Sequence, residues 1–192
     1  MVDKELITTK KQLKEWLRMD SVHYYTQTQP FWKRLKYNLL AHPCMDQRYT
    51  WKYIKTLRRC EYHINNPGIA HMFLRILYLW KLRRLSYKTA IQIPPNAVGP
   101  GLNLPHFGAI NMNENSKVGR NATIYSGVRL GWKKRGLPCP CIGDNVFIGT
   151  GTNIIGDVHI GDNVTIGQNC VIVKDVQSGA TVVAQQPRIL EK

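Results

Sequence analysis

The chain has 192 residues, of which 43% are hydrophobic and 20% are charged, and its formal net charge at pH 7 is +15. This balance is typical of a folded globular protein and excludes an intrinsically disordered one, and the charge predicts anionic partners such as nucleic acid, a membrane surface or phosphorylated small molecules. The five cysteines are scattered and odd in number, and the N-terminus has charges where a secretory signal needs an apolar core. We therefore expect free thiols and a cytoplasmic protein.

Helical periodicity runs through the first 90 residues. Apolar residues recur at spacings of three and four within residues 13–19, 31–40, 49–64 and 69–89. The longest apolar stretch, residues 68–80, contains His71 and Arg75 and is too short to span a bilayer. The sequence therefore predicts an α-helical region without a transmembrane helix.

This helical region is strongly basic. Between Phe31 and Lys88 there are thirteen Lys and Arg residues and two acidic residues, interleaved with Trp, Tyr and Phe. Such a mixture favours an anionic lipid surface, and we expect peripheral docking on the inner membrane face. It also suits nucleic acid, but no recognised nucleic-acid-binding motif is present, so we expect no nucleic-acid partner. The alternative is that the helices pack on the rest of the protein and their charges are solvated.

A segment rich in helix breakers follows. Residues 93–101, IPPNAVGPG, contain three prolines and two glycines. Such clusters end regular structure and are typical of domain boundaries. We therefore predict a basic α-helical region over residues 1–90, a second domain over residues 91–183 and a C-terminal tail over residues 184–192.

Beyond this boundary, aliphatic residues recur every six positions. They are Val98, Leu104, Ile110, Val118, Ile124, Leu130, Ile142, Ile148, Ile154, Ile160, Ile166 and Ile172, with two extra residues after Ile110 and six after Leu130. This period fits neither an α-helix nor a hairpin sheet, but it fits a parallel β-helix in which three hexads form one triangular coil. The glycine that often follows the aliphatic residue is expected to permit the turn. Starts at Val98, Val118, Ile142 and Ile160 predict about four coils; a β-sandwich with coincidental spacing is the alternative.

Three segments resemble a known family: RLSYKT (84–89), IQIPPNAVGPGLNLPHFGAI (91–110) and IGDNVFIGTGTNIIGDVHIGDNVTIGQNCVIVKDV (142–176). They resemble the left-handed β-helix acyltransferases of the hexapeptide-repeat superfamily. The closest likeness is to serine acetyltransferases, in the branch found in capsule and exopolysaccharide gene clusters. The resemblance implies a mainly β fold with an α-helical N-terminal region, the β part being a left-handed parallel β-helix of about four coils. It also implies acetyl-CoA as donor, a small-molecule hydroxyl acceptor, and a homotrimer with active sites between neighbouring prisms.

The chemistry points to one histidine. Acetyl transfer from a thioester to an alcohol needs a base, because an alkyl hydroxyl is scarcely ionised at neutral pH, and neutral imidazole is suited to this role. The resemblance assigns it to His106, in the segment LPHFG (104–108). Backbone N–H groups near the glycine-rich turns are candidates for stabilising the oxyanion. The alternative is a partly buried histidine with a structural role.

Two family positions are changed in this sequence. The aspartate that orients the catalytic histidine of serine acetyltransferases is replaced by Gln92, which can hold the ring by a hydrogen bond but cannot stabilise imidazolium by charge. Glu114 is a candidate substitute. A second family histidine, which helps to hold serine, aligns with Cys139. Two acceptors stay open, L-serine by family resemblance and a sugar hydroxyl in capsule or polysaccharide biosynthesis, and a non-catalytic hexapeptide-repeat scaffold is a further alternative.

The resemblance also implies where coenzyme A lies. Its pantetheine arm is expected along Gly131, Thr150 and Gln168. Lys174 and Arg188 are candidates for binding its phosphates.

The remaining chemistry-bearing residues are two cysteines and a histidine. Cys139 and Cys141, with His159, are candidates for a zinc site, but four tetrahedral ligands are not evident and we expect no metal. Cys139 as a nucleophile is a further alternative. The interpretation we favour is that both cysteines line a loop at the junction between subunits.

Overall fold

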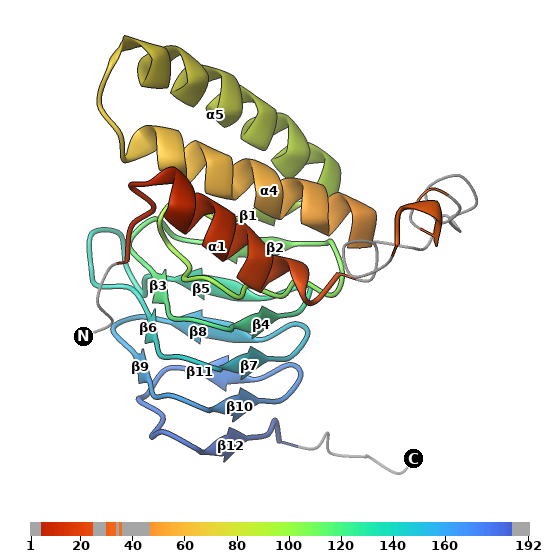
Figure 1. Ribbon diagram of the computed structural model, residues 1–192. Coiled ribbons are helices and arrows are strands. Elements are labelled where there is room, and N and C mark those ends of the chain that lie inside the picture. Colours follow the sequence, from red (N-terminus) through yellow and green to blue (C-terminus); the bar gives the residue numbers. More distant parts are fainter. Residues whose placement is uncertain (1–4, 25–29, 34, 36–46, 186–192) are drawn as a thin grey trace.

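The helical region of the computed structural model, which describes residues 5–24, 30–33, 35 and 47–185, contains α1 (Lys10–Ser21), α4 (Gln47–Ile64) and α5 (Ile69–Thr89) (Figure 1). Most of the predicted helix over residues 31–40 lies outside the described residues. α1 begins at a capping box formed by Thr9 and Gln12, and α5 ends at Ala90, whose φ of 55° is left-handed. None of the described helices is long and apolar enough to cross a membrane.

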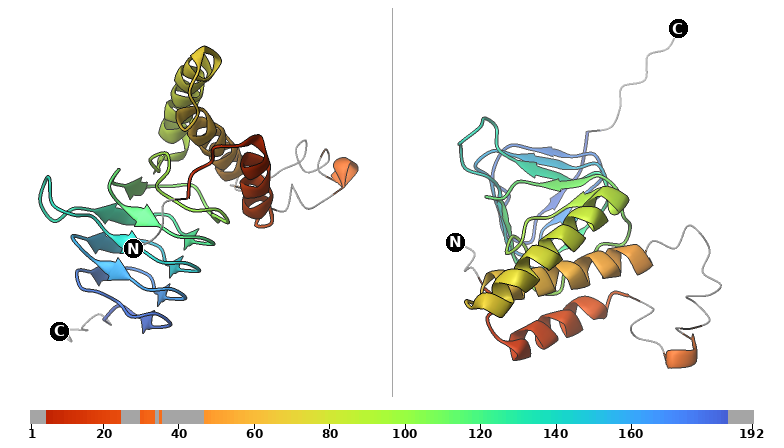
Figure 2. Two further views of the ribbon diagram at one scale, coloured as in Figure 1. Left: turned by 60° about the vertical axis from the view of Figure 1, so that its left-hand side comes forward. Right: turned by 90° about the horizontal axis from the view of Figure 1, so that it is seen from above.

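The rest of the described chain forms a parallel β-helix whose three sides are three sheets (Figure 2). The five-stranded sheet contains β1 (Ile91–Gln92), β2 (Ile110–Met112), β5 (Arg129–Gly131), β8 (Asn153–Ile155) and β11 (Val171–Ile172). The four-stranded sheet contains β4 (Thr123–Ile124), β7 (Phe147–Ile148), β10 (Thr165–Ile166) and β12 (Thr181–Val182). The three-stranded sheet contains β3 (Lys117–Val118), β6 (Cys141–Ile142) and β9 (His159–Ile160). Every strand pair is parallel, which confirms the predicted β-helix.

The strand register corrects one position of the predicted period. Met112, and not Ile110, pairs with Leu130 and so takes the hexad's interior position. Both side chains are buried, which is why the sequence pattern does not distinguish them. The two extra residues therefore lie before Met112, in the loop that carries His106. Because it is longer than a regular hexad turn, this loop departs from the outline of the prism.

The glycines that follow the aliphatic positions have a different role from the one predicted. Gly119, Gly143 and Gly161 do not have positive φ. The left-handed residue of each turn lies two positions further on, and these residues are Asn121, Asn145 and Asn163, with φ of 54°, 57° and 58°. Instead, a Cβ on Gly119 would lie 2.7 Å from the carbonyl oxygen of Gly143 in the next coil. The close approach of stacked backbones thus requires glycine at most of these positions, with Gly131 as an exception.

The helices cap the open end of the first coil. The Tyr53 hydroxyl accepts a hydrogen bond from the Ile93 N–H at 3.0 Å, and the Tyr24 hydroxyl accepts one from the Leu104 N–H at 3.0 Å. Burial raises the pKa of both phenols, that of Tyr53 to about 12, so both stay protonated at neutral pH. Backbone groups that would form an unpaired strand edge are thereby satisfied.

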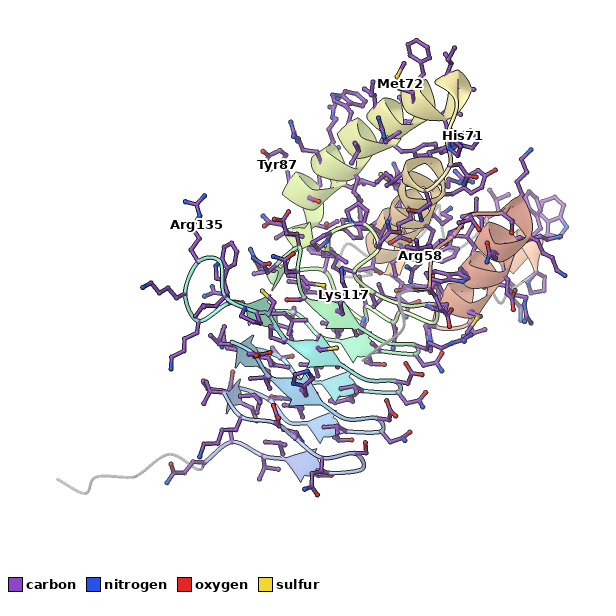
Figure 3. All side chains as sticks on the ribbon, turned by 90° about the vertical axis from the view of Figure 1, so that its left-hand side faces the viewer. Arg58, His71, Met72, Tyr87, Lys117 and Arg135 are labelled. Atoms are coloured by element: carbon purple, nitrogen blue, oxygen red, sulfur yellow. The ribbon has the colours of Figure 1, made fainter. Side chains whose placement is uncertain are left out.

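A buried charge cluster completes this cap. Arg58 has no exposed surface and donates to Asp20 Oδ2 at 2.8 Å, to Glu61 Oε2 at 3.1 Å, and to the carbonyls of Val98 and Gly99 at 2.8 and 2.6 Å. Figure 3 shows Arg58 between the helices and the first coil. The hydrophobic core is continuous across this junction, from Trp51 and Leu57 of α4 into the prism.

Candidate functional site

His106 lies on the loop that connects the four-stranded side of the prism to β2. The loop is held at Gly108, whose N–H donates to the Thr89 carbonyl at 2.9 Å. His106 and Phe107 are exposed. The His106 ring lies 6.1 Å from the ring of Tyr125, and the Phe107 ring lies 6.1 Å from that of Tyr49. The loop thus presents an imidazole on the surface, flanked by aromatic rings.

We call the corner that carries this loop the histidine edge. It consists of the turns that precede β2, β5, β8 and β11, and it includes His106, Thr150 and Gln168. Successive turns are hydrogen-bonded, from Gly151 N–H to the Ser126 carbonyl at 3.1 Å and from Asn169 N–H to the Thr150 carbonyl at 2.8 Å. Three predicted site residues therefore share one corner and form a column along the prism.

The opposite corner of the five-stranded sheet carries three more of the predicted residues. We call it the loop edge; it consists of the segments that follow β2, β5, β8 and β11, including Gly131, Cys139 and Lys174. The long insertion, residues 131–141, leaves the prism here, and Figure 3 shows Arg135 on this loop directed away from the body. Because the strands are parallel, all of them begin at the histidine edge and end at the loop edge. Within one chain, the length of a strand therefore separates the two edges.

Cys139 is buried and its thiol donates to Asn113 Oδ1 at 3.2 Å. Burial raises the pKa of Cys139, so the thiol stays protonated. A protonated, hydrogen-bonded thiol is a weak nucleophile, which argues against the nucleophile interpretation. Cys141 lies beside His159 in the register of β6 and β9, where His159 begins a strand and is exposed. The described residues contain no group of three or more His, Cys, Asp or Glu arranged to hold a metal ion.

Of the two predicted positioning groups for His106, Gln92 and Glu114, Gln92 lies beside the start of β2, where its backbone pairs with that of Asn111. Gln92 is exposed on β1, and its Oε1 accepts a hydrogen bond from Asn111 Nδ2 at 3.0 Å. Glu114 follows β2 whereas His106 precedes it, so a strand separates the two. Arg188, the predicted phosphate ligand, lies outside the described residues.

Tyr125 is a neighbour of His106 that the sequence analysis did not predict. Tyr125 follows the interior residue Ile124, just as Pro105 follows the interior residue Leu104. The Ile124 N–H donates to the Asn103 carbonyl at 3.0 Å, which pairs the two coils. Tyr125 therefore lies in the coil directly beneath the histidine loop. The sequence contains the signal, because residues at equal hexad positions stack in register.

A cavity of about 660 Å³ lies elsewhere, along the three-stranded sheet. Its lining includes Val98, Gly119, Cys141 and His159, but none of His106, Thr150 and Gln168. The histidine edge is an open surface in a single chain.

Comparisons with known proteins agree with this architecture. The family "Bacterial transferase hexapeptide (six repeats)" matches residues 142–174. A serine acetyltransferase of Staphylococcus xylosus is 41% identical over 75 residues, which are 38% of this chain and 35% of that protein. The crystal structure of a Neisseria gonorrhoeae serine acetyltransferase in complex with serine has a TM-score of 0.62 and 27% identity, covering 93% of this chain and 70% of that one. The chain is thus similar to serine acetyltransferases and to hexapeptide-repeat transferases over parts of its length.

The fold of this chain is accordingly the left-handed parallel β-helix of these structures. A further serine acetyltransferase structure, a complex with CoA, has a TM-score of 0.66 and 23% identity, covering 94% of this chain and 71% of that one. The matched segment spans about a third of the length of the curated Staphylococcus relative, 35%.

Proposed function

We propose that the protein is an acetyl-CoA-dependent O-acetyltransferase in which His106 is the general base. The observation that carries this proposal is the position of His106, exposed on an extended loop at the head of a column of turns that includes Thr150 and Gln168. The similarity to serine acetyltransferases, one of them described as a complex with CoA, supports the donor.

The reaction follows from what the imidazole does. Neutral His106 takes the proton of the acceptor hydroxyl as its oxygen bonds to the thioester carbonyl carbon. The carbon–sulfur bond breaks, the acetyl group becomes an ester, and the departing sulfur takes up the proton from the imidazolium. Backbone N–H groups of the turns at the histidine edge are the candidates for stabilising the developing oxyanion.

The proposed donor site combines both edges. Thr150 and Gln168 line the pantetheine arm from one chain, and Gly131 lines it from the loop edge of a neighbouring chain. Lys174 is exposed at the same edge, nearer the C-terminal end of the prism, where it is available to a phosphate. Gly131 suits close contact, because a Cβ there would meet only Ile155 Cδ1, at 3.9 Å, within 4 Å.

The proposed assembly is a homotrimer with its active sites between chains. Support comes from the separation of His106 from Gly131 and Cys139 across the five-stranded sheet within one chain. In a cyclic trimer the histidine edge of one chain lies against its neighbour, and three equivalent sites form. A single chain then supplies half of each of two sites.

The acceptor is the least constrained part of the proposal. L-serine follows from the similarity to serine acetyltransferases, one of which is described as a complex with serine. A sugar hydroxyl is the second candidate. Gln92 replaces the family aspartate with a neutral amide that is bonded to Asn111, and Cys139 replaces a family histidine with a buried thiol. Both changes remove polar or charged groups that the family uses around serine.

The test is the release of free coenzyme A from acetyl-CoA with L-serine, sugars and sugar nucleotides as acceptors. His106→Asn should reduce the rate about 10²–10⁴-fold, the usual contribution of a general base. His159→Asn is the matched control, because His159 is also exposed but lies on the three-stranded sheet, and its rate should not change. Equal rates in the two variants would refute the role of His106. Absence of both turnover and coenzyme A binding in the unmodified protein would instead support a scaffold.

A further inference from the structure

α5 packs against α4 on one side, but much of its remaining surface is not covered within the described chain. No residue from Ile69 to Lys81 is buried, although this stretch is largely apolar. Ile69 is 75% exposed, Phe73 64% and Trp80 53%. Single exposed apolar residues are ordinary, but a contiguous set this large marks an interaction surface.

The exposed apolar residues lie in one row. With about 100° of rotation per residue, Ile69, Phe73, Ile76, Trp80 and Tyr87 fall on one side of the helix. Leu82, Leu85 and Thr89, the buried residues of α5, fall on the opposite side. We call the row, together with Arg83 and Arg84, the outer face of α5.

The outer face is at one end of the molecule. α5 lies above α4, at the end of the molecule opposite β12 (Figure 1), and its N-terminal half extends away from the β-helix (Figure 2). Figure 3 shows Met72 and Tyr87 directed away from the rest of the protein. A flat surface can approach this end without meeting the prism.

The charge of α5 identifies the chemistry of its partner. The helix contains five Lys and Arg residues and no acidic residue. Arg83 and Arg84 straddle the C-terminal end of the apolar row, and the guanidinium of Arg84 lies 4.8 Å from the ring centre of Trp80. An exposed apolar row bordered by cations and aromatic rings matches the interface of an anionic bilayer, where the rings sit at the headgroup level.

A second copy of α5 is a poorer match. Two outer faces packed in parallel would bring Arg83 and Arg84 near the same cations of the partner, and in either orientation α5 offers no carboxylate to pair with them. An anionic lipid surface compensates these charges while also accepting the apolar side chains.

We propose that the outer face of α5 binds the surface of an anionic lipid bilayer, with the helix lying along the interface. Phe73, Ile76 and Trp80 enter the boundary between headgroups and acyl chains, while Arg83 and Arg84 contact lipid phosphates. Lipid binding through α5 is independent of acetyl transfer, because the outer face contains none of the residues assigned to that reaction.

The experiment is vesicle co-sedimentation of the full chain at 0.1 M NaCl. One set of vesicles contains phosphatidylcholine alone, and the other contains phosphatidylcholine with phosphatidylglycerol. The protein should bind the anionic vesicles and be released as NaCl is raised. Binding to neither vesicle, or equal binding to both, would overturn the proposal.

Two variants locate the contact. Phe73→Gln/Ile76→Gln/Trp80→Gln should reduce partitioning at least about tenfold, and Arg83→Gln/Arg84→Gln should reduce it about thirtyfold. The matched controls are Val171→Gln/Val173→Gln/Val183→Gln, three exposed apolar residues of the β-helix, and Lys10→Gln/Lys11→Gln, two exposed cations of α1. Losses as large in the controls would refute a site on α5.

Self-association is tested in the same samples without lipid. Sedimentation velocity of the unmodified chain and the triple glutamine variant should give the same oligomeric state. If the variant instead dissociates, the outer face is an interface between copies of this chain and the proposal is wrong. Coenzyme A release with a soluble acceptor should be equal in both, so failure of lipid binding is distinguishable from failure of acetyl transfer.

Discussion

Replacing Arg58 tests the cap that joins the helices to the β-helix. Arg58→Met keeps much of the side-chain length but removes the guanidinium. Asp20 and Glu61, each with no exposed surface, would then lose their shared cation, and the carbonyls of Val98 and Gly99 would lose a donor. Asp20 would still accept from the N–H groups of Gly101 and Leu102, so the cap would be weakened from one side.

The cost is large compared with the stability of a domain. Removing one partner of a buried ion pair costs about 3–5 kcal/mol, because the remaining charge is uncompensated. Each unsatisfied carbonyl adds about 1–3 kcal/mol, part of which is recovered when water enters. We expect Arg58→Met to lower the free energy of unfolding by about 5 kcal/mol, against about 5–15 kcal/mol for a typical whole domain. For a chain of this size, that is a decrease in Tm of about 10–20 °C.

The assay is thermal unfolding followed by circular dichroism. Arg59→Met is the matched control, since Arg59 is the next residue of α4 and is exposed, and its Tm should change by less than about 2 °C. Arg58→Met/Asp20→Asn/Glu61→Gln, which removes all three charges, should be more stable than Arg58→Met alone. A Tm for Arg58→Met within the range of the control would refute the reasoning.

The pH dependence of Arg58→Met gives an independent check. Burial raises the pKa of Glu61, while Arg58 and the Asn96 N–H oppose the rise. Without Arg58 the pKa of Glu61 in the folded state rises further. A carboxyl whose folded-state pKa is raised favours the folded state at low pH and loses that contribution as pH rises. The difference in Tm between the variant and the unmodified chain should therefore be smaller at pH 5 than at pH 8.

Three further outcomes follow from the same structure. Gly149→Ala should lower the Tm, because the added Cβ would lie 2.7 Å from the backbone of the coil below, whereas Gly131→Ala should not; equal effects would contradict the stacking role of the glycines. Burial raises the pKa of Cys139, so its alkylation by iodoacetamide should be slower than that of glutathione at pH 8, and a faster reaction would contradict its burial. Burial lowers the pKa of His63, and so does His71, whose Nδ1 lies 3.0 Å from the Nδ1 of His63. The unfolded chain therefore binds a proton here more readily than the folded one, and the free energy of unfolding should decrease as the pH is lowered below about 6.5. Tm should fall less between pH 7.5 and 5.5 in His71→Phe than in the unmodified chain, and an unchanged dependence would exclude this pair as its source.

The coil architecture was predictable because interior positions are chemically uniform. Twelve aliphatic residues at a six-residue step can stack only in a repeating prism, and the sequence alone predicts the four coil starts. The register at Met112 was not predictable, since two apolar residues two positions apart both satisfy the pattern. Arg58 was also missed, because a lone arginine on an amphipathic helix is usually solvated.

The common corner of three candidate residues was predictable from the sequence, whereas the positions of the others were not. His106, Thr150 and Gln168 come from equivalent turns of the first, third and fourth coils, so equal hexad positions are enough to align them. The distance between His106 and Cys139 depends on the corners of the prism at which their two loops are inserted. The spacing of residues in the sequence does not identify these corners. Glu114 illustrates the limit: it is near His106 in sequence but lies beyond the other end of β2.

The most direct test of the central claim mixes two inactive chains. His106→Ala removes the base, and Gly131→Phe fills the proposed pantetheine path at the loop edge of the neighbouring chain. Each variant alone should release almost no coenzyme A. After the two are denatured, mixed in equal amounts and refolded together, random assembly into rings should restore about a quarter of the wild-type rate, because that share of interfaces pairs two intact edges. Each variant must refold to the same oligomer as the unmodified chain. If the mixture then releases no coenzyme A, the result would contradict a site formed by His106 and a neighbouring chain.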